Sequence, residues 1–203
     1  MRMHKYNDGT IKKKSKREKI ESMKYFNEML IFSKADEKGI GEESEKLPYV
    51  IITVGISGSG KSTWRKQFLA KSDFELICPD NIRKYMTGNI GDQSKNNEVW
   101  ESVFSELDRL ISSKTNVVFD STCTNIDTVK RILRRTKDVA IPIFKIFECN
   151  PDVAKCRVNA DILSGIDRAN VPSEIVDRQY VGFTKVKAFL NKSDYLIMAE
   201  NND

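Results

Sequence analysis

A short glycine-rich segment between an apolar run and a helix-forming stretch constrains the fold of this chain most. The segment Gly55-Ile56-Ser57-Gly58-Ser59-Gly60-Lys61-Ser62 satisfies the pattern GxxxxGK[ST] at every position, directly after the β-branched run Val50-Ile51-Ile52-Thr53-Val54. In such a loop the backbone N–H groups converge on phosphate oxygens, and the following helix adds the partial positive charge of its N-terminus. The pattern predicts a phosphate-binding loop between a buried strand and a helix.

The side chains of this loop predict a nucleotide ligand. We expect Lys61 to reach the β- and γ-phosphates and Ser62 to ligate Mg²⁺. The predicted nucleotide-binding residues are Gly55, Ser57, Gly58, Ser59, Gly60, Lys61, Ser62 and Thr63. The alternative is a loop that has lost its ligand.

Strand-like and helix-like segments alternate from residue 49 onward. Short apolar runs predict strands, and apolar residues at helical spacing predict helices. The expected strands are 50–54, 75–78, 117–119, 141–147 and 195–198, and the expected helices are about 62–70, one with an apolar stripe between 99 and 111, 126–137, 151–163 and 173–190. This alternation predicts an α/β fold of the P-loop NTPase type, with a parallel sheet of about five strands and helices on both faces. The tryptophan and phenylalanine beside the 99–111 stripe are interpreted as core.

Two carboxylates follow predicted strands. Asp80 follows the second strand, with Arg83 one helical turn later, and Asp120 follows the third. Ligands of open α/β sheets bind at this edge, so Asp80 could accept the proton of an attacking hydroxyl while Arg83 holds a phosphate. Asp120 stands where a Walker B carboxylate orients Mg²⁺, so the predicted metal-site residues are Ser62 and Asp120. The alternatives are that Asp80 caps a helix beginning near Ile82 and that Asp120 forms a turn.

Two arginines lie in a segment that suits a lid. Arg157 is in the helix after the fourth strand, and Arg168 is in the turn before Val171-Pro172. Arginines that close over a nucleotide neutralise charge in a phosphoryl transition state and exclude water. The alternative is that both are surface residues.

Positive charge gathers in two further places. The helix over 126–137 carries Lys130, Arg131, Arg134, Arg135 and Lys137. Residues 1–24 hold nine Lys and Arg against three Asp and Glu, a net charge of +6, whereas residues 25–48 have three against six, a net charge of −3. Either basic stretch could attract a nucleic acid backbone, and either could be a solvated surface.

The first 48 residues are predicted to be an extension of the main domain. Ser15 and Glu18 match a capping box, and apolar residues at helical spacing predict a helix over about 15–34, followed by a Gly- and Glu-rich linker that ends at Pro48. The predicted division is therefore a basic extension over 1–48 and a P-loop domain over 49–203.

Composition excludes several classes of protein and of chemistry. No apolar run reaches the roughly 20 residues of a membrane helix, and the N-terminus lacks the pattern of a secretory signal, so we expect an intracellular, cytoplasmic protein without a membrane partner. The four cysteines form no CxxC pair and His4 is the only histidine, which argues against structural zinc and against histidine-based nucleophilic catalysis. The expected chemistry depends on carboxylates, lysine, arginine and Mg²⁺.

Taken together, these motifs resemble the kinase domain of phage polynucleotide 5′-hydroxyl kinase and its P-loop relatives over about residues 49–190. The matching features are Gly-Ser-Gly-Lys-Ser-Thr-Trp at 58–64, Asp80-x-x-Arg83, the strand end Asp120-Ser121-Thr122 and the arginine-bearing lid before Val171-Pro172. The chain departs from the phage pattern at Pro79 and Cys123, and an insertion separates Arg157 from Arg168. It has no Asp-x-Asp-x-Thr phosphatase signature.

This resemblance implies an ATP- and Mg²⁺-dependent phosphotransferase acting on a hydroxyl of DNA or RNA, foremost a 5′ end. It implies that Asp80 activates the hydroxyl, Arg83 grips the acceptor's phosphate and Lys61 stabilises the γ-phosphoryl, with Asp120, Arg157 and Arg168 completing the catalytic set. Two other functions stay open at this point. One is a kinase of hydroxymethylated bases in DNA or of a small metabolite, and the other is a non-catalytic module that binds nucleic acid under nucleotide control.

Overall fold

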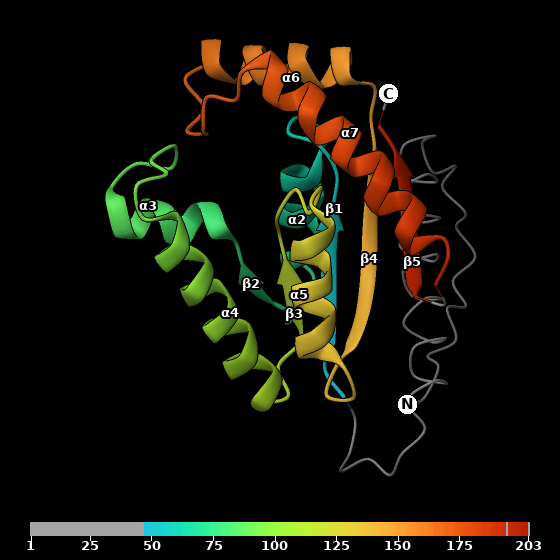
Figure 1. The fold of residues 1–203 in the computed structure, drawn as a ribbon. Helices are drawn as coiled ribbons and strands as arrows, with labels where there is room; N and C mark the ends of the chain where they lie inside the picture. Colours follow the sequence, from blue (N-terminus) through green and yellow to red (C-terminus); the bar gives the residue numbers. More distant parts are fainter. Residues whose placement is uncertain (1–46, 194, 203) are drawn as a thin grey trace, which may run out of the picture. The chain divides into compact units, whose positions relative to one another are not determined.

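The computed structural model describes residues 47–193 and 195–202. The helix predicted over 15–34 and the linker after it lie outside these residues. The described elements alternate between strands and helices along the whole domain (Figure 1): β1 Tyr49–Val54, α2 Lys61–Leu69, β2 Glu75–Ile77, α3 Pro79–Thr87, α4 Asn96–Ser112, β3 Val117–Phe119, α5 Ile126–Thr136, β4 Ile141–Glu148, α6 Pro151–Leu163, α7 Ser173–Leu190 and β5 Leu196–Asn201.

The five strands form one parallel sheet in the order β2-β3-β1-β4-β5, which confirms the predicted α/β fold. All six residues of the central strand β1 are buried. A strand covered on both faces contains apolar residues without alternation, which explains the continuous run in the sequence.

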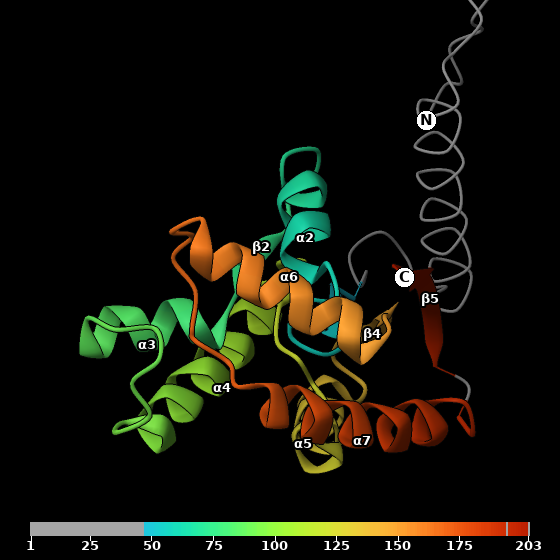
Figure 2. The same ribbon diagram turned by 90° about the horizontal axis from the view of Figure 1, so that it is seen from above.

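Helices cover both faces of the sheet (Figure 2). The helices α4, α5 and α7 pack against one face and share the main core with β1, β3 and β4, while α2 lies on the other face, where Trp64 contacts Phe147 at a ring-centroid distance of 5.7 Å. The helix α6 crosses the edge at which the strands end (Figure 1). None of the helices in the described part of the chain combines the length and apolar character needed to cross a membrane.

Two element boundaries differ from the expected positions by more than one residue. The helix α3 begins at Pro79 rather than near Ile82, because a proline in the first helical turn costs no backbone hydrogen bond. The strand β5 continues to Asn201, three residues beyond the predicted end, because its pairing with β4 persists after the apolar run has stopped. Backbone pairing at a sheet edge does not require apolar side chains.

The topology locates the functional edge of the sheet. The strands β1 and β3 are neighbours in the sheet. The connection from β1 through α2 leads to β2, on one side of this pair, and the connection from β3 through α5 leads to β4, on the other side. Ligands of open α/β sheets bind at the carboxyl ends of the strands at such a reversal. The glycine-rich loop follows β1, and Asp120 follows β3.

Candidate active site

The loop after β1 has a conformation that requires glycine at two positions. Gly58 has a φ of +82° and Gly60 a φ of +94°, both in the left-handed region that side chains rarely adopt. A Cβ at Gly58 would also lie 2.4 Å from the carbonyl oxygen of Ala154 in α6. The glycines therefore let the loop curl tightly between β1 and α6, directly before the N-terminus of α2.

Lys61 is a buried cation inside this loop. Its Nζ donates hydrogen bonds to the carbonyl oxygens of Gly55 at 2.9 Å and Ile56 at 2.7 Å. Burial lowers the pKa of Lys61 from 10.5 to about 8, although the negative charge of Asp120 acts in the opposite direction. Phosphate oxygens are stronger acceptors for this ammonium than neutral carbonyls are.

A cavity of about 400 Å³ surrounds the loop. Six of the eight predicted nucleotide-binding residues line it, namely Ser57, Gly58, Gly60, Lys61, Ser62 and Thr63. Gly55 and Ser59 do not. A Cβ at Gly55 would meet Ser59 Oγ at 2.7 Å, and the Ser59 side chain is fully buried, so these two residues support the loop from behind.

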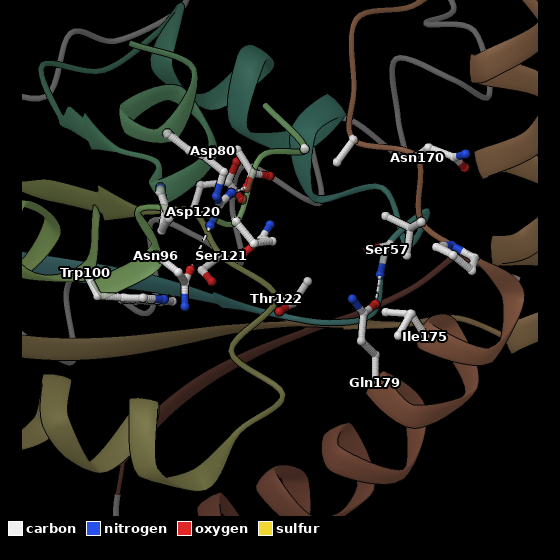
Figure 3. Close-up of a pocket in the computed structure, with 17 residues that line it drawn as sticks. Ser57, Asp80, Asn96, Trp100, Asp120, Ser121, Thr122, Asn170, Ile175 and Gln179 are labelled. Carbon is white, nitrogen blue, oxygen red and sulfur yellow. Dashed lines mark hydrogen bonds and ion pairs between the residues drawn. The ribbon is translucent and has the colours of Figure 1, made fainter. Parts of the chain in front are cut away.

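A second cavity, of about 510 Å³, shares part of its lining with the first, and Figure 3 shows the residues around this second cavity. Its walls come from α3, α4, α7, the loop after β3 and the segment before α7. Both cavities are lined by Asp80, Asp120, Ser121 and Thr122. The carboxylates predicted from the strand ends thus lie where two chambers meet.

Asp80 and Arg83 form an ion pair on α3. The Nη1 of Arg83 donates to the Asp80 carboxylate, and its Nη2 donates to Asn96 Oδ1 of α4 at 3.4 Å. The buried Nε of Arg83 has no hydrogen-bond partner in the described part of the chain. Cys78, not Asp80, is the N-cap residue of α3, so the interpretation of Asp80 as a helix cap is wrong. The Asp80 side chain is 54 % exposed, so a ligand can reach its carboxylate beside Arg83.

Asp120 has two partners that the sequence analysis missed. Its Oδ2 accepts from Arg65 Nη1 of α2 at 2.5 Å, and its Oδ1 accepts from Thr53 Oγ1 of β1 at 3.1 Å. Arg65 follows Lys61 by four residues and therefore lies on the same side of α2. That spacing is the signal from which Arg65 could have been found.

The two predicted lid arginines both line the loop cavity. Arg157 donates to Cys149 Sγ at 3.4 Å, and Arg168 pairs with Asp161 at 2.5 Å. In addition, Lys84 of α3 pairs with Asp167, which links α3 to the segment between α6 and α7. The structure therefore places both arginines beside the loop, and their catalytic role stays a prediction.

The basic helix α5 is only partly a solvated face. The guanidinium carbons of Arg131 and Arg135 lie 4.2 and 4.5 Å from the ring centroid of Phe104, and Arg135 also pairs with Asp108 at 3.3 Å. These two arginines attach α5 to α4. Lys130, Arg134 and Lys137 are exposed.

Gln179 of α7 is a further site residue without a sequence signal. Its Oε1 accepts from the backbone N–H of Ser57 at 2.8 Å, so α7 contacts the glycine-rich loop from the side of the second cavity (Figure 3). Because 122 residues separate the two, only the fold brings them together.

Comparison with known proteins gives a family match and a set of shared folds. The model of the family described as an AAA domain matches residues 50–185. No curated protein matches the chain.

Several solved structures share the fold at low sequence identity. A chain of the Pnkp1/Rnl/Hen1 RNA repair complex is 18 % identical, with a TM-score of 0.66, and the match covers 76 % of the present chain. It covers 49 % of the repair-complex chain, so the present chain spans about half the length of that relative. A protein described as a candidate kinase from Chloroflexus aurantiacus is 13 % identical with a TM-score of 0.59, over 77 % of this chain and 89 % of that one. A structure of the PezAT toxin-antitoxin system of Streptococcus pneumoniae is 17 % identical with a TM-score of 0.57, over 87 % and 77 % of the two chains. The predicted resemblance to P-loop kinases is confirmed at the level of the fold.

Proposed function

The chain belongs to the AAA domain family, and on that premise we propose that it is a kinase that transfers the γ-phosphoryl group of ATP to a hydroxyl of a nucleic acid, specifically a polynucleotide 5′-hydroxyl. The observation that carries the proposal is the position of Asp80 between two cavities, one formed around the phosphate-binding loop and one beyond it. Phosphoryl transfer needs such a division, because donor and acceptor must meet in line at one point.

The loop cavity provides the donor side of the reaction. Residues of the glycine-rich loop and of the first turn of α2 line this chamber, as do Arg157 and Arg168. In the proposed reaction Lys61 leaves the carbonyls of Gly55 and Ile56 for phosphate oxygens, and the arginines neutralise charge that develops on the transferring group. The work of these residues is positioning and electrostatic stabilisation.

The residues at the loop fit a magnesium ion that is held mainly by substrate phosphates. Ser62 is exposed to the loop cavity, while both oxygens of Asp120 already accept one hydrogen bond each and keep further lone pairs. Among the described residues no group of three or more His, Cys, Asp or Glu side chains could hold a metal ion alone. Ser62 and Asp120 would hold Mg²⁺, which neutralises phosphate charge when bound.

The second cavity provides the acceptor side. Asp80 would accept the proton of the attacking hydroxyl, and Arg83 holds this carboxylate in place. The long hydrogen bond from Arg83 Nη2 to Asn96 leaves this donor for an acceptor phosphate. An acceptor that carries both a hydroxyl and a nearby phosphate matches the end of a polynucleotide.

Replacement of Asp80 tests whether its carboxylate is the general base that accepts the proton of the hydroxyl. We expect Asp80→Asn to lower kcat by about 10²- to 10⁴-fold with little change in ATP affinity, because an amide cannot accept the proton. Lys61→Ala should lower both kcat and ATP affinity. The measurements are steady-state transfer to a 5′-hydroxyl oligonucleotide and calorimetric ATP binding, with the exposed Asp138→Asn as the matched control. Turnover near that of the control in Asp80→Asn would remove Asp80 from the reaction.

A further inference from the structure

Trp100 is a partly buried residue that packs against the core and also lines the acceptor cavity. It lies on α4 beside a stripe of fully buried residues, yet it is only partly buried and lines the acceptor cavity together with Asn96, one helical turn earlier (Figure 3). Core packing accounts for the buried part of this side chain, and the part that lines the cavity is accessible to a ligand.

The Trp100 ring is supported from behind by a stack of side chains. It stacks on Phe104 with ring centroids 5.6 Å apart and an interplanar angle of 28°. Phe104 is 2 % exposed, and Arg131 and Arg135 of α5 lie over its ring. Cation–π and aromatic contacts of this kind fix the ring orientation, so Trp100 presents a rigid surface to the cavity.

The opposite wall of the cavity has a matching character. Figure 3 shows Ile175 and Gln179, four residues apart on α7, across the cavity from Trp100 and Asn96. Each wall thus combines an apolar side chain with an amide. Apolar surfaces accept the face of a planar ring, and amides can pair with the hydrogen-bonding groups on its edge.

We propose that Trp100 is the stacking platform for the nucleobase of the nucleotide that carries the acceptor hydroxyl. This inference rests on the proposed function and specifies its substrate class: the hydroxyl lies at Asp80, the phosphate at Arg83 and the base against Trp100. Stacking tolerates every base, because each has a π face, so the platform selects for a base without selecting which one.

Tryptophan fluorescence tests this contact without any reaction. The chain has two tryptophans, Trp64 and Trp100, and Trp64 is buried between Phe68 and Phe147. A 5′-hydroxyl oligonucleotide should quench the fluorescence of Trp64→Phe, in which Trp100 remains, and leave that of Trp100→Phe unchanged. The same oligonucleotide with an abasic 5′ nucleotide should quench neither. Quenching located on Trp64, or equal quenching by the abasic strand, would overturn the inference.

Kinetics separate this inference from the function on which it rests. In a transfer assay, Trp100→Leu should raise KM for the base-bearing end by roughly 5- to 150-fold, the equivalent of one lost stacking contact, with little effect on the abasic end. Trp100→Phe should retain most of the wild-type KM, and Tyr85→Leu, which alters an aromatic residue that is 91 % exposed on α3, is the control.

The transfer assay distinguishes failure of the Trp100 inference from failure of the proposed kinase function. Transfer to both ends with an equal loss in Trp100→Leu would overturn the role of Trp100 and leave the kinase in place. Absence of transfer to any nucleic acid by the wild-type protein would overturn the proposed function itself.

Discussion

Lys61 is a buried lysine, and no carboxylate of the described residues is in hydrogen-bond contact with its ammonium group. Its Nζ donates to two backbone carbonyls and, at 3.5 Å, to the hydroxyl of Ser59. Desolvation therefore dominates and lowers the pKa of Lys61 to about 8. Phosphate binding would reverse this shift, because it supplies the missing negative charge.

This pKa gives a pH dependence to the stability of the nucleotide-free protein. Between pH 8 and 10.5 the unfolded lysine binds a proton that the folded one has lost, so the free energy of unfolding rises with pH by up to about 1.4 kcal/mol per unit in this interval. Other groups titrate there as well, and Lys61→Met removes only this contribution. The difference in unfolding free energy between wild type and Lys61→Met, from urea titrations, should therefore increase from pH 8 to 10. A difference that stays constant over this range would contradict the assignment.

Among individual residues, those that follow strands were predictable and those that meet through the fold were not. Asp80 and Asp120 could be placed because parallel strands end at one edge of a sheet. The partnership of Arg65 with Asp120 depends on the orientation of α2, and the exposure of Trp100 depends on where α3 and α7 lie around α4. Helical periodicity alone assigned Trp100 to the core.

At the scale of elements, α7 connects the acceptor cavity to the phosphate-binding loop. Gln179 contacts the loop, and three residues later Gly182 lies against the segment after β3, where an added Cβ would be 2.2 Å from the carbonyl oxygen of Thr124. The close approach of α7 to this segment therefore requires glycine, which has no side chain, at position 182. Glycine in the middle of a helix otherwise costs about 1 kcal/mol relative to alanine.

Gly182→Ala tests whether this approach positions the helix. Propensity alone predicts that the substitution stabilises α7, whereas the contact predicts a loss of about 1–3 kcal/mol in the free energy of unfolding and weaker ATP binding, because Gln179 moves away from Ser57. Urea unfolding and calorimetry measure the two effects. Val181→Ala, at an adjacent exposed position, should change stability by less than about 0.5 kcal/mol. A stabilised Gly182→Ala protein would refute the account of this contact.

The elements themselves were largely predictable, because each follows from local pattern. The five strands and the helices α2, α4, α5, α6 and α7 all appear near their predicted positions, since apolar periodicity and turn residues act over short distances. The strand order β2-β3-β1-β4-β5 was not predicted, because it depends on which side of the sheet each connection crosses. That order brings β1 beside β3 and so brings the glycine-rich loop beside Asp120.

For the whole domain, the central claim is that two cavities meeting at Asp80 serve one transfer reaction. The donor chamber follows from the loop after β1, and the acceptor chamber follows from α3, α4 and α7. A protein that only bound nucleotide would not need the second chamber to share its carboxylates with the first. The acceptor class is therefore the property that decides the account.

Transfer of labelled γ-phosphate from ATP, with Mg²⁺, to three DNAs tests this claim most directly. The acceptors are a 5′-hydroxyl oligonucleotide, its 5′-phosphorylated copy and a 5′-phosphorylated copy that contains hydroxymethylated pyrimidines. The account predicts label on the first alone. Label on the third alone would reassign the acceptor to a base, and label on none of them, with ATP binding intact, would contradict a DNA-end kinase.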